Sequence, residues 1–373
     1  MRAAVLFSAV LLAAGTACGL YRGDEYEPRN WRFDSEYTID VLTFQLPRRM
    51  VRMYREAERA YMVTAGSVRP EDMYIVQMLK IPMELDGPWN FAFYFDMSED
   101  WDGIYHHHRL ELNMDMKAGW QIYGFGEPLA EKEYSDIGFG FRYMRDDMLA
   151  DIAVAWPNLW WNEKNELGSV VLQRPLNLRF SGEMPSGKGI FLPWFDLDFR
   201  SIYTYDFDAF NFRFEKYRLG LEYELPVNER LFVWAAASAE YCRKRRWGYA
   251  PGDPADFTLA RDAGRVQAEY EWWFIESDAL TAGFLWNYIN EDTYRPNDPA
   301  ATVYMQVNEF IPYLAWTRKV NERFLFSTGV YADWVVWQEL YPGNPAADKD
   351  FAAWRVKVPF RFMFPGPAGE LVV

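Results

Sequence analysis

The C-terminal part of the chain alternates strictly between apolar and other residues. Successive side chains of a β-strand point to opposite faces of the sheet, so the segment 352–364 predicts one aromatic face and one largely basic face. Soluble sheets rarely expose so much Trp and Phe on one face, which favours a strand with lipid on that side. The apolar series is Ala352, Trp354, Val356, Val358, Phe360, Phe362 and Phe364, and between its members lie residues that include Arg355, Lys357, Pro359 and Arg361.

The same alternation recurs along most of the chain. It is visible in the segments 89–97, 109–116, 137–143, 195–200 and 265–274. The interleaved residues are often charged, and a dry sandwich core would not accept so many charges. A wet interior would accept them. The recurrence therefore predicts an all-β protein, a transmembrane antiparallel β-barrel.

The composition agrees with a barrel better than with a helical membrane protein. No stretch after the N-terminus approaches the roughly 18 continuous apolar residues that a transmembrane helix needs. Mean hydropathy is -0.30, although 18% of the residues are aromatic. In a barrel only alternate residues meet lipid, so the average hydropathy stays low. The formal net charge of -15 argues against a nucleic-acid partner.

The N-terminus has the pattern of an export signal. Arg2 supplies a positive charge, residues 3–14 form a short apolar core, and residues 15–17 are small, which predicts a signal peptide over 1–17. Cys18 stands where a bacterial lipoprotein carries its lipidated cysteine, but a Leu-like residue is missing three places upstream. The alternative is an ordinary signal peptide with a cysteine nearby. The other cysteine, Cys242, is too isolated to indicate a disulfide framework.

Connections between the predicted strands alternate in length. Short turns occur near 86–87, 117–119, 145–147, 185–187, 227–229, 276–278 and 320–322, and longer segments occur at 157–167, 243–257, 290–301 and 341–350. Bacterial outer-membrane barrels have short periplasmic turns and longer outer loops. On that rule the last strand ends on the periplasmic side. The tetrapeptide Val-Asn-Glu-Arg at 227–230 and 320–323 indicates shared hairpin chemistry rather than a domain repeat.

The strand count is estimated from the alternating segments. Residues 72–364 give about fifteen strands, and because single-chain bacterial barrels usually have an even number, a further strand is expected at 35–45. About sixteen strands are therefore predicted, with fourteen as the alternative. Residues 48–63 show apolar positions at helical spacing, which fits a short plug, a loop helix or a misread strand. Residues 18–34 are an N-terminal segment before the barrel.

One stretch breaks the alternation. Phe210, Phe212 and Phe214 share one face, and then Tyr217 and Leu219 continue on positions of the other parity. A β-bulge at 215–216 would restore a single apolar face. Two short strands are the alternative, which is less favoured because no turn residues lie between them.

Little in the sequence indicates catalysis or a cofactor. The three histidines are adjacent, and His106 and His108 would share one face of a strand, where two imidazoles can bind a metal. The competing interpretation places them in the polar aromatic girdle at the membrane surface. A barrel hydrolase would need one of these histidines beside a serine, of which Ser98 is nearest in sequence. No phosphate loop, CxxC or nucleophile elbow is present, so neither enzyme activity nor a cofactor is predicted.

The remaining candidate site is the interior of the barrel. About sixteen strands leave an aqueous channel, and charges on its wall bias the passage of ions and solutes. The same charges can also pair with one another to hold the wall. The predicted pore-lining residues are Arg142, Arg179, Asp196, Asp198, Arg200, Arg213, Glu222, Glu224, Glu269, Glu271, Arg355, Lys357 and Arg361.

In strand pattern, export signal and turn parity, residues 35–364 resemble bacterial outer-membrane porins. The resemblance implies a location in the bacterial outer membrane and a channel for passive diffusion of small polar or charged solutes. It also implies contact with membrane lipid and with the barrel-assembly machinery, and it leaves homo-oligomerisation open. One departure is the tail 365–373, which follows Phe364, where such barrels commonly end. The alternatives are a plugged transporter for hydrophobic ligands, similar to fatty-acid transporters, or a barrel enzyme or scaffold.

Overall fold

The computed structural model describes residues 60–68, 73–85, 87–99, 104–126, 137–145, 148–156, 164–165, 168–173, 176–205, 210–358, 360–363 and 366–367. Most of these residues are in β-strands, and short 3-10 turns lie at Lys117–Gly119 (η1), Pro299–Ala301 (η3) and Pro345–Ala347 (η4). Over the described ranges, no helix has the length and apolar character needed to cross a membrane.

The first group of strands is short, between 7 and 12 residues each. These strands are β1 (Tyr61–Val68), β2 (Met73–Glu84), β3 (Trp89–Glu99), β4 (Ile104–Asp115), β5 (Trp120–Gly126), β6 (Ile137–Arg145) and β7 (Met148–Trp156).

Most of the following strands are longer, and β11 to β17 each have 17 to 19 residues. The bounds are β8 (Lys164–Asn165), β9 (Gly168–Gln173), β10 (Asn177–Ser186), β11 (Gly189–Tyr205), β12 (Phe210–Asn228), β13 (Leu231–Gly248), β14 (Phe257–Ile275), β15 (Asp278–Tyr294), β16 (Val303–Asn321), β17 (Phe324–Leu340), β18 (Lys349–Lys357), β19 (Phe360–Met363) and β20 (Gly366–Pro367).

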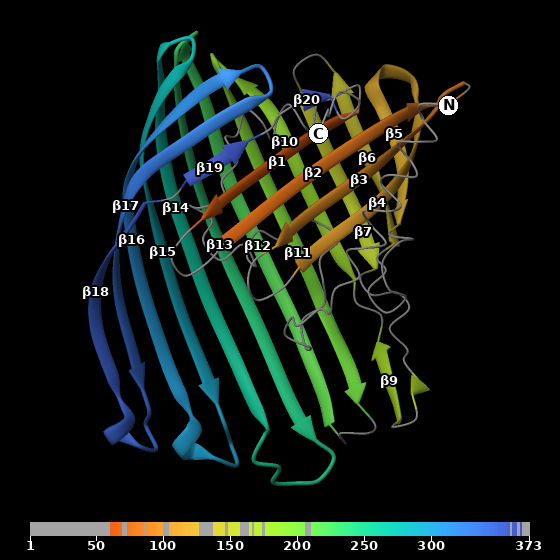
Figure 1. The fold of residues 1–373 in the computed structure, drawn as a ribbon. Coiled ribbons are helices and arrows are strands. Elements are labelled where there is room, and N and C mark those ends of the chain that lie inside the picture. Colours follow the sequence, from red (N-terminus) through yellow and green to blue (C-terminus); the bar gives the residue numbers. More distant parts are fainter. Residues whose placement is uncertain are drawn as a thin grey trace.

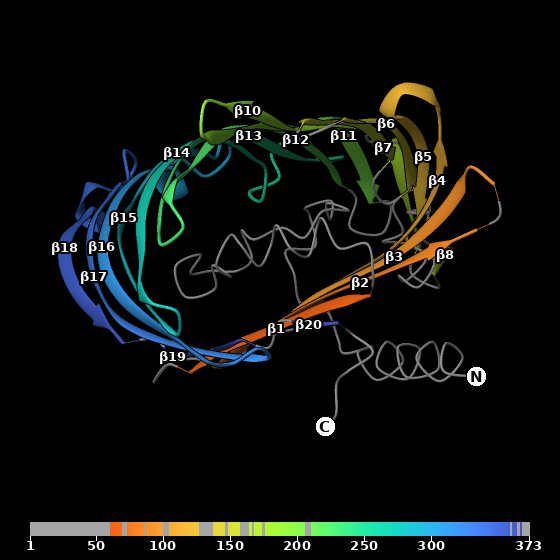
Figure 2. The ribbon, with the colours of Figure 1, turned by 90° about the horizontal axis from the view of Figure 1, so that it is seen from above.

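The strand pairing runs in a closed circuit, and every pair is antiparallel. Each of β1 to β7 pairs with the next strand, β7 pairs with β10, and the sequence continues to β17. β17 pairs with both β18 and β19, and β19 pairs with β1, where Ala65 is opposite Met363. The ring is visible end-on in Figure 2. Counting β18 and β19 as one interrupted strand, the described part of the ring has sixteen strands, which confirms the predicted count.

The first strand of the ring begins at Tyr61. Residues 61–63, at the end of the segment 48–63, are extended and pair with β2, so for these residues the alternative of a misread strand is the one that the structure shows. Val63, Thr64 and Val68 are β-branched, and this favours the pleated conformation. Residues 1–59 lie outside the described residues, including the predicted signal peptide, Cys18, the segment 18–34, the candidate strand 35–45 and the helical spacing over 48–59. In the predicted tail, Gly366 and Pro367 form β20 and pair with β1.

The two faces of the wall differ in chemistry. On β6, Phe139 and Phe141 are each 44% exposed, whereas Gly138 and Gly140, which alternate with them, are buried. Side chains on the convex face of a closed ring spread apart, while those on the concave face converge, so the exposed apolar series lies outside. A band of exposed Trp, Phe and Leu side chains on an antiparallel ring is the pattern of a transmembrane barrel.

The two predicted hairpins with the Val-Asn-Glu-Arg sequence share their turn geometry. Asn228 accepts a hydrogen bond at Oδ1 from the backbone N–H of Arg230 (2.9 Å), and Asn321 accepts the same bond from Arg323 (2.8 Å). Such a bond stabilises the reversal of the chain locally. The expectation of shared hairpin chemistry is confirmed.

The predicted bulge lies on the neighbouring strand. β12 pairs with β13 without interruption from Phe210 to Pro226, whereas the β11 register changes between Asp198 and Ser201. The extra residue is therefore in β11, opposite Glu215. As a consequence Phe210, Phe212 and Phe214 stay on the face of Lys216 and Arg218, and the prediction of a bulge at 215–216 is wrong. A single strand cannot reveal this, because an extra residue can be placed in either member of a pair.

Candidate functional site

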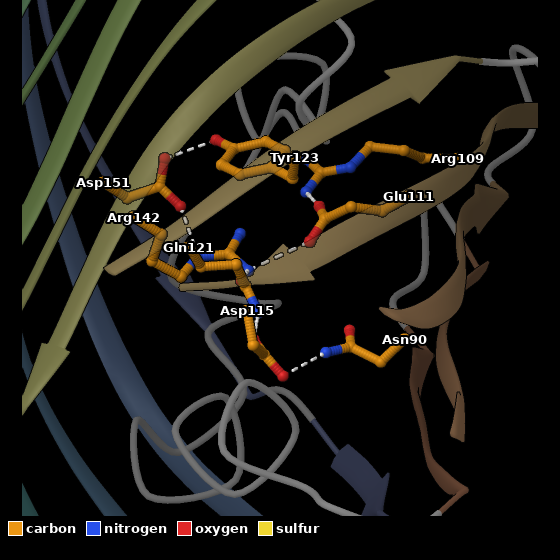
Figure 3. Close-up of polar contacts among 8 residues, drawn as sticks. All are labelled: Asn90, Arg109, Glu111, Asp115, Gln121, Tyr123, Arg142 and Asp151. Carbon is orange, nitrogen blue, oxygen red and sulfur yellow. Dashed lines mark hydrogen bonds and ion pairs between the residues drawn. The ribbon is translucent and has the colours of Figure 1, made fainter. Parts of the chain in front are cut away.

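The inner face of β3 to β7 carries a dense group of polar side chains, which we call the first polar cluster (Figure 3). Strand pairing assembles it, because Arg142 on β6 stands directly opposite Gln121 on β5 and Asp151 on β7. Glu111 extends from β4 on the same face. The members drawn in Figure 3 are Asn90, Arg109, Glu111, Asp115, Gln121, Tyr123, Arg142 and Asp151.

Arg142 lies at the centre of the first polar cluster. Its Nη1 donates to Glu111 Oε1 at 3.0 Å and to Gln121 Oε1 at 2.9 Å, and its Nε donates to Asp151 Oδ2 at 2.7 Å. Arg109 forms a second ion pair with Glu111, whose side chain is 0% exposed. One guanidinium group thus bridges two carboxylates that come from different strands, and charge-assisted bonds of this kind are the stronger ones in proteins.

Aromatic rings lie flat against the wall within the same cluster. The guanidinium of Arg142 lies 4.5 Å from the centroid of the Tyr123 ring, and the Tyr123 hydroxyl donates to Asp151. Gly140 on β6 makes this possible, because a Cβ atom there would lie 2.4 Å from Tyr123 Cζ. The ring occupies the space that a side chain would need. Gly138 and Gly140 therefore leave the space in which the Phe125 and Tyr123 rings of β5 lie.

A second polar cluster continues around the wall on β10, β11 and β12. Asn177 donates from Nδ2 to Oδ1 of Asp196 and of Asp198, at 2.6 Å in both cases. Arg218 Nη2 lies 2.9 Å from Asp196 Oδ2, and Arg179 Nε lies 3.2 Å from Asp196 Oδ1. The side chains of Asp196 and Arg179 are each 3% exposed. Two arginines thus pair with Asp196, and Asn177 links Asp196 to Asp198.

Further charge pairs follow on the remaining strands. Glu240 on β13 lies between Lys216 (3.5 Å) and Arg261 (3.6 Å). On the far wall, Arg355 Nη2 lies 2.7 Å from Asp333 Oδ2 and 3.7 Å from Glu309 Oε1. The side chain of Arg355 is 55% exposed although its partner Asp333 is fully buried. Paired charges of both signs thus occur around the inner face from β4 to β18.

Most predicted pore-lining residues share this inner face. The strand registers place nine of them there, namely Arg142, Arg179, Asp196, Asp198, Glu222, Glu224, Glu269, Glu271 and Arg355. Lys357 and Arg361 occupy register positions opposite Tyr331 and Ser327. Arg200 and Arg213 are on the outer side, because β12 keeps one register through Glu215 and the extra residue is in β11.

Sequence reasoning missed several members of the clusters. Arg109 and Glu111 were seen only as residues that alternate with apolar ones in the segment 109–116, and Lys216, Glu240, Arg261 and Asp333 were not singled out. Parity carried to every strand would have placed them on the inner face. Their ion-pair partners cannot be predicted from parity, because residues such as Glu111 and Arg142 are 31 positions apart in the sequence.

The histidine run is divided between the two faces of β4. His106 and His108 stand opposite Met97 and Phe95, and His107 stands opposite Asp96. The His108 side chain is buried, with its ring centroid 5.5 Å from that of Phe95. Among the described residues, no group of three or more His, Cys, Asp or Glu side chains is placed to hold a metal ion. A metal site at His106 and His108 stays a prediction.

Comparison with known proteins gives a likeness of architecture. No family profile matches the sequence, and no curated protein matches it. Similar solved structures include a loop-deletion mutant of OmpT, an outer membrane protein of Vibrio cholerae, with 9% identity over 82% of this chain and 97% of that chain and a TM-score of 0.42. Salmonella typhi OmpF in complex with daunomycin has 9% identity over 82% and 96%, with a TM-score of 0.42. A mutant of Rh. blastica porin has 9% identity over 82% and 98%, with a TM-score of 0.35.

These TM-scores are below 0.5, so the fold assignment depends on the molecule itself. The antiparallel circuit closes through the pairing of β19 with β1, β18 is paired with β17 alone among the described strands, and the exposed outer face is apolar and aromatic. A ring that satisfies its backbone hydrogen bonds internally is one of two structures able to span a bilayer. The chain is accordingly a transmembrane β-barrel of the outer-membrane type.

Proposed function

We propose that this barrel is a channel in the bacterial outer membrane for passive diffusion of small polar or charged solutes. The observation that supports the proposal most strongly is the belt of paired charges on the inner face, from the first polar cluster on β4–β7 to Arg355 on β18. β5 and β18 lie on opposite sides of the ring (Figure 2). A ring of about sixteen strands leaves room for water between such walls.

The charges fix a field across the barrel. Each cluster holds its side chains against the wall through ion pairs within that wall, as Arg142 does with Glu111 and Asp151. Charges that are held in place need little reorganisation when a solute passes, and rings of side-chain charge are a common source of selectivity in pores. The proposed pore-lining residues are the nine on the inner face together with Lys357 and Arg361.

Arg355 is the side chain in this belt best suited to act on a solute. More than half of it is exposed, yet Asp333 and Glu309 hold its guanidinium at the wall. Replacing Arg355 by Glu would put a carboxylate beside the buried Asp333 and remove one positive charge from the inner face. We expect the preference for anions over cations to fall.

Conductance across a planar lipid bilayer tests the proposal. The purified protein should give discrete single-channel steps, and Arg355→Glu should shift the reversal potential in a salt gradient towards cation preference. Arg230→Glu is the matched control, because it makes the same charge change in the exposed β12–β13 turn, and it should leave the reversal potential nearly unchanged. Folded protein that gives no conductance would contradict the channel and favour a plugged transporter or a scaffold.

The proposal assigns no catalytic residue and no cofactor to the chain. Its partners would be outer-membrane lipid, the diffusing solutes and the machinery that assembles barrels, and a homo-oligomer is compatible with it. Removal of the segment 1–17 as a signal peptide belongs to the same proposal, since a chain must be exported to reach this membrane. N-terminal sequencing of the mature protein would locate the cleavage site and would show whether Cys18 carries lipid.

A further inference from the structure

The outer face of β11, β12 and β13 changes from apolar to basic within a short distance. Along β12, from the β12–β13 turn towards Phe210, the outward residues include Leu221 and Leu219, which are 41% and 60% exposed, and then Tyr217. Beyond Tyr217 the next outward residues are Glu215 and Arg213. The apolar surface therefore ends at Tyr217 on this strand.

Tyr217 belongs to an aromatic layer that marks the same boundary on three strands. Its ring is parallel to that of Tyr241 on β13, with 6.2 Å between the centroids, and Phe199 on β11 meets it edge-on at 6.2 Å. Tyrosines gather at membrane surfaces because one end of the side chain is apolar and the other is polar. The layer indicates where the hydrocarbon region ends on the side of the longer loops.

Strand length gives an independent argument for this boundary. A barrel strand needs about 9–11 residues to cross the hydrocarbon region. β12 and β13 have 19 and 18 residues, so each continues well beyond the membrane at one end. In Figure 1 the long strands extend further towards the bottom of the view than β1 to β7 do. The aromatic layer lies partway along these long strands, as the length predicts.

Four arginines stand immediately beyond the aromatic layer and form what we call the outward basic patch: Arg200, Arg213, Arg243 and Arg245. Arg213 is directly opposite Arg245, and Glu215 is directly opposite Arg243. Glu215 contacts Arg213 at 3.0 Å and Arg200 at 3.9 Å. Glu215 therefore lies beside three of these arginines, and Arg245 stands opposite Arg213, although like charges in opposed positions destabilise a sheet.

Among the described residues of β14 to β17, no comparable group of basic side chains stands on the outer face. At corresponding outward positions towards the loop ends of β14 to β17, the described residues are acidic or uncharged, including Asp262, Asn290, Asp292, Gln306, Asn308 and Gln338. If polar side chains were needed here only for contact with water above the membrane, these acidic and uncharged residues would serve equally well. The four arginines on β11–β13 outnumber Glu215, the carboxylate that contacts two of them, so this patch has a net positive charge.

We propose that the outward basic patch binds the phosphate of an anionic lipid headgroup in the membrane leaflet on the side of the longer loops. The planar guanidinium presents paired N–H donors that match phosphate oxygens. Arg243 and Arg245 are exposed, and they lie directly beyond Tyr241, at the depth where a lipid in contact with the apolar wall places its phosphate. Arg213, held by Glu215, is the preoriented member. This inference depends on the membrane location alone and not on the channel.

Native mass spectrometry of the detergent-purified barrel tests this assignment, with phosphatidylglycerol and phosphatidylcholine added in separate titrations. The wild-type protein should bind phosphatidylglycerol more tightly. In Arg243→Gln/Arg245→Gln, the apparent Kd for phosphatidylglycerol should rise about 25-fold, because each arginine near an anionic surface contributes about fivefold in affinity. Phosphatidylcholine binding should be unchanged.

The control Lys188→Gln/Arg230→Gln removes two positive charges from the short turns of the same strands, and its affinity should stay within about twofold of wild type. Equal binding of the two lipids by the wild-type protein would overturn the proposal, as would an unchanged Kd in the arginine variant or an equal loss in the control. Displacement of phosphatidylglycerol by inorganic phosphate at the same concentration would show a site for free phosphate, which also overturns it. Heat-dependent gel mobility shows that each variant is folded.

Discussion

Replacing Arg142 by methionine should destabilise the barrel more than any replacement of an exposed charge. Methionine retains most of the length of the side chain but removes the donors to Glu111, Gln121 and Asp151. Breaking a buried pair by removing one partner generally costs about 3–5 kcal/mol, because it leaves a buried charge uncompensated. In Arg142→Met, Glu111 still forms its ion pair with Arg109, and Asp151 still accepts the hydrogen bond from Tyr123. We therefore expect the free energy of unfolding to fall by an amount at the lower end of this range, about 3 kcal/mol.

The measurement is reversible urea unfolding in phospholipid vesicles, followed by tryptophan fluorescence. Lys319→Met is the matched control, because it removes a cation from an ion pair in which Glu322 is 87% exposed. Surface pairs contribute about 0–1 kcal/mol. The free energy of unfolding should therefore fall several times more in Arg142→Met than in Lys319→Met.

A double-mutant cycle identifies the cause. Glu111→Gln in the Arg142→Met background neutralises the carboxylate that lost one of its two arginine partners, so the double variant should be less destabilised than the sum of the single variants. Coupling energies of about 0.5–3 kcal/mol are usual for residues in one network. Additive effects, or a loss in Arg142→Met no larger than in Lys319→Met, would refute the conclusion that buried ion pairs hold this wall.

Two further predictions concern packing and pH. Gly140→Val should destabilise the barrel by about 1–3 kcal/mol in the same urea assay, because its side chain would overlap the Tyr123 ring, and it should cost far less when combined with Tyr123→Ala. In the loop between β13 and β14, the backbone N–H of Ala255 and then the Arg246 side chain hold the pKa of Asp253 below its usual value of 3.8. A lowered folded-state pKa means that the contribution to stability is complete above the unfolded pKa and is lost as pH falls through the folded one. Amide-exchange protection of residues 249–256 should accordingly fall only below about pH 4 and should lose this dependence in Asp253→Asn.

The alternation in the sequence was sufficient to predict the strands and most of their faces. Arg355 and Glu269 were placed correctly on the inner face because parity depends only on local order. Arg200 and Arg213 were misplaced, since their face depends on whether the extra residue sits in β11 or in β12. That choice is made by pairing between segments that are distant in sequence.

The start of the ring and the partners of the inner charges were likewise beyond sequence reasoning. A further strand was expected at 35–45, which lies outside the described residues, and the described ring closes through Tyr61–Val68. Only residues 61–63 of this strand belong to the segment 48–63, where the apolar spacing left a plug, a loop helix and a misread strand open. The bond between Glu111 and Arg142 arises only once β4, β5 and β6 are in register. Both features depend on closure of the whole ring rather than on any single strand.

The central claim is that lipid covers one face of these strands and water meets the other. Single cysteines carrying a nitroxide label at Val266, Gln267, Ala268 and Glu269 on β14, in a Cys18→Ala/Cys242→Ala background, test it directly in vesicles. Collisions with oxygen, which concentrates in lipid, should peak at positions 266 and 268, and collisions with a water-soluble nickel complex should be suppressed there relative to 267 and 269. Equal access at all four positions, or access of the nickel complex to position 266, would contradict a barrel standing in a membrane.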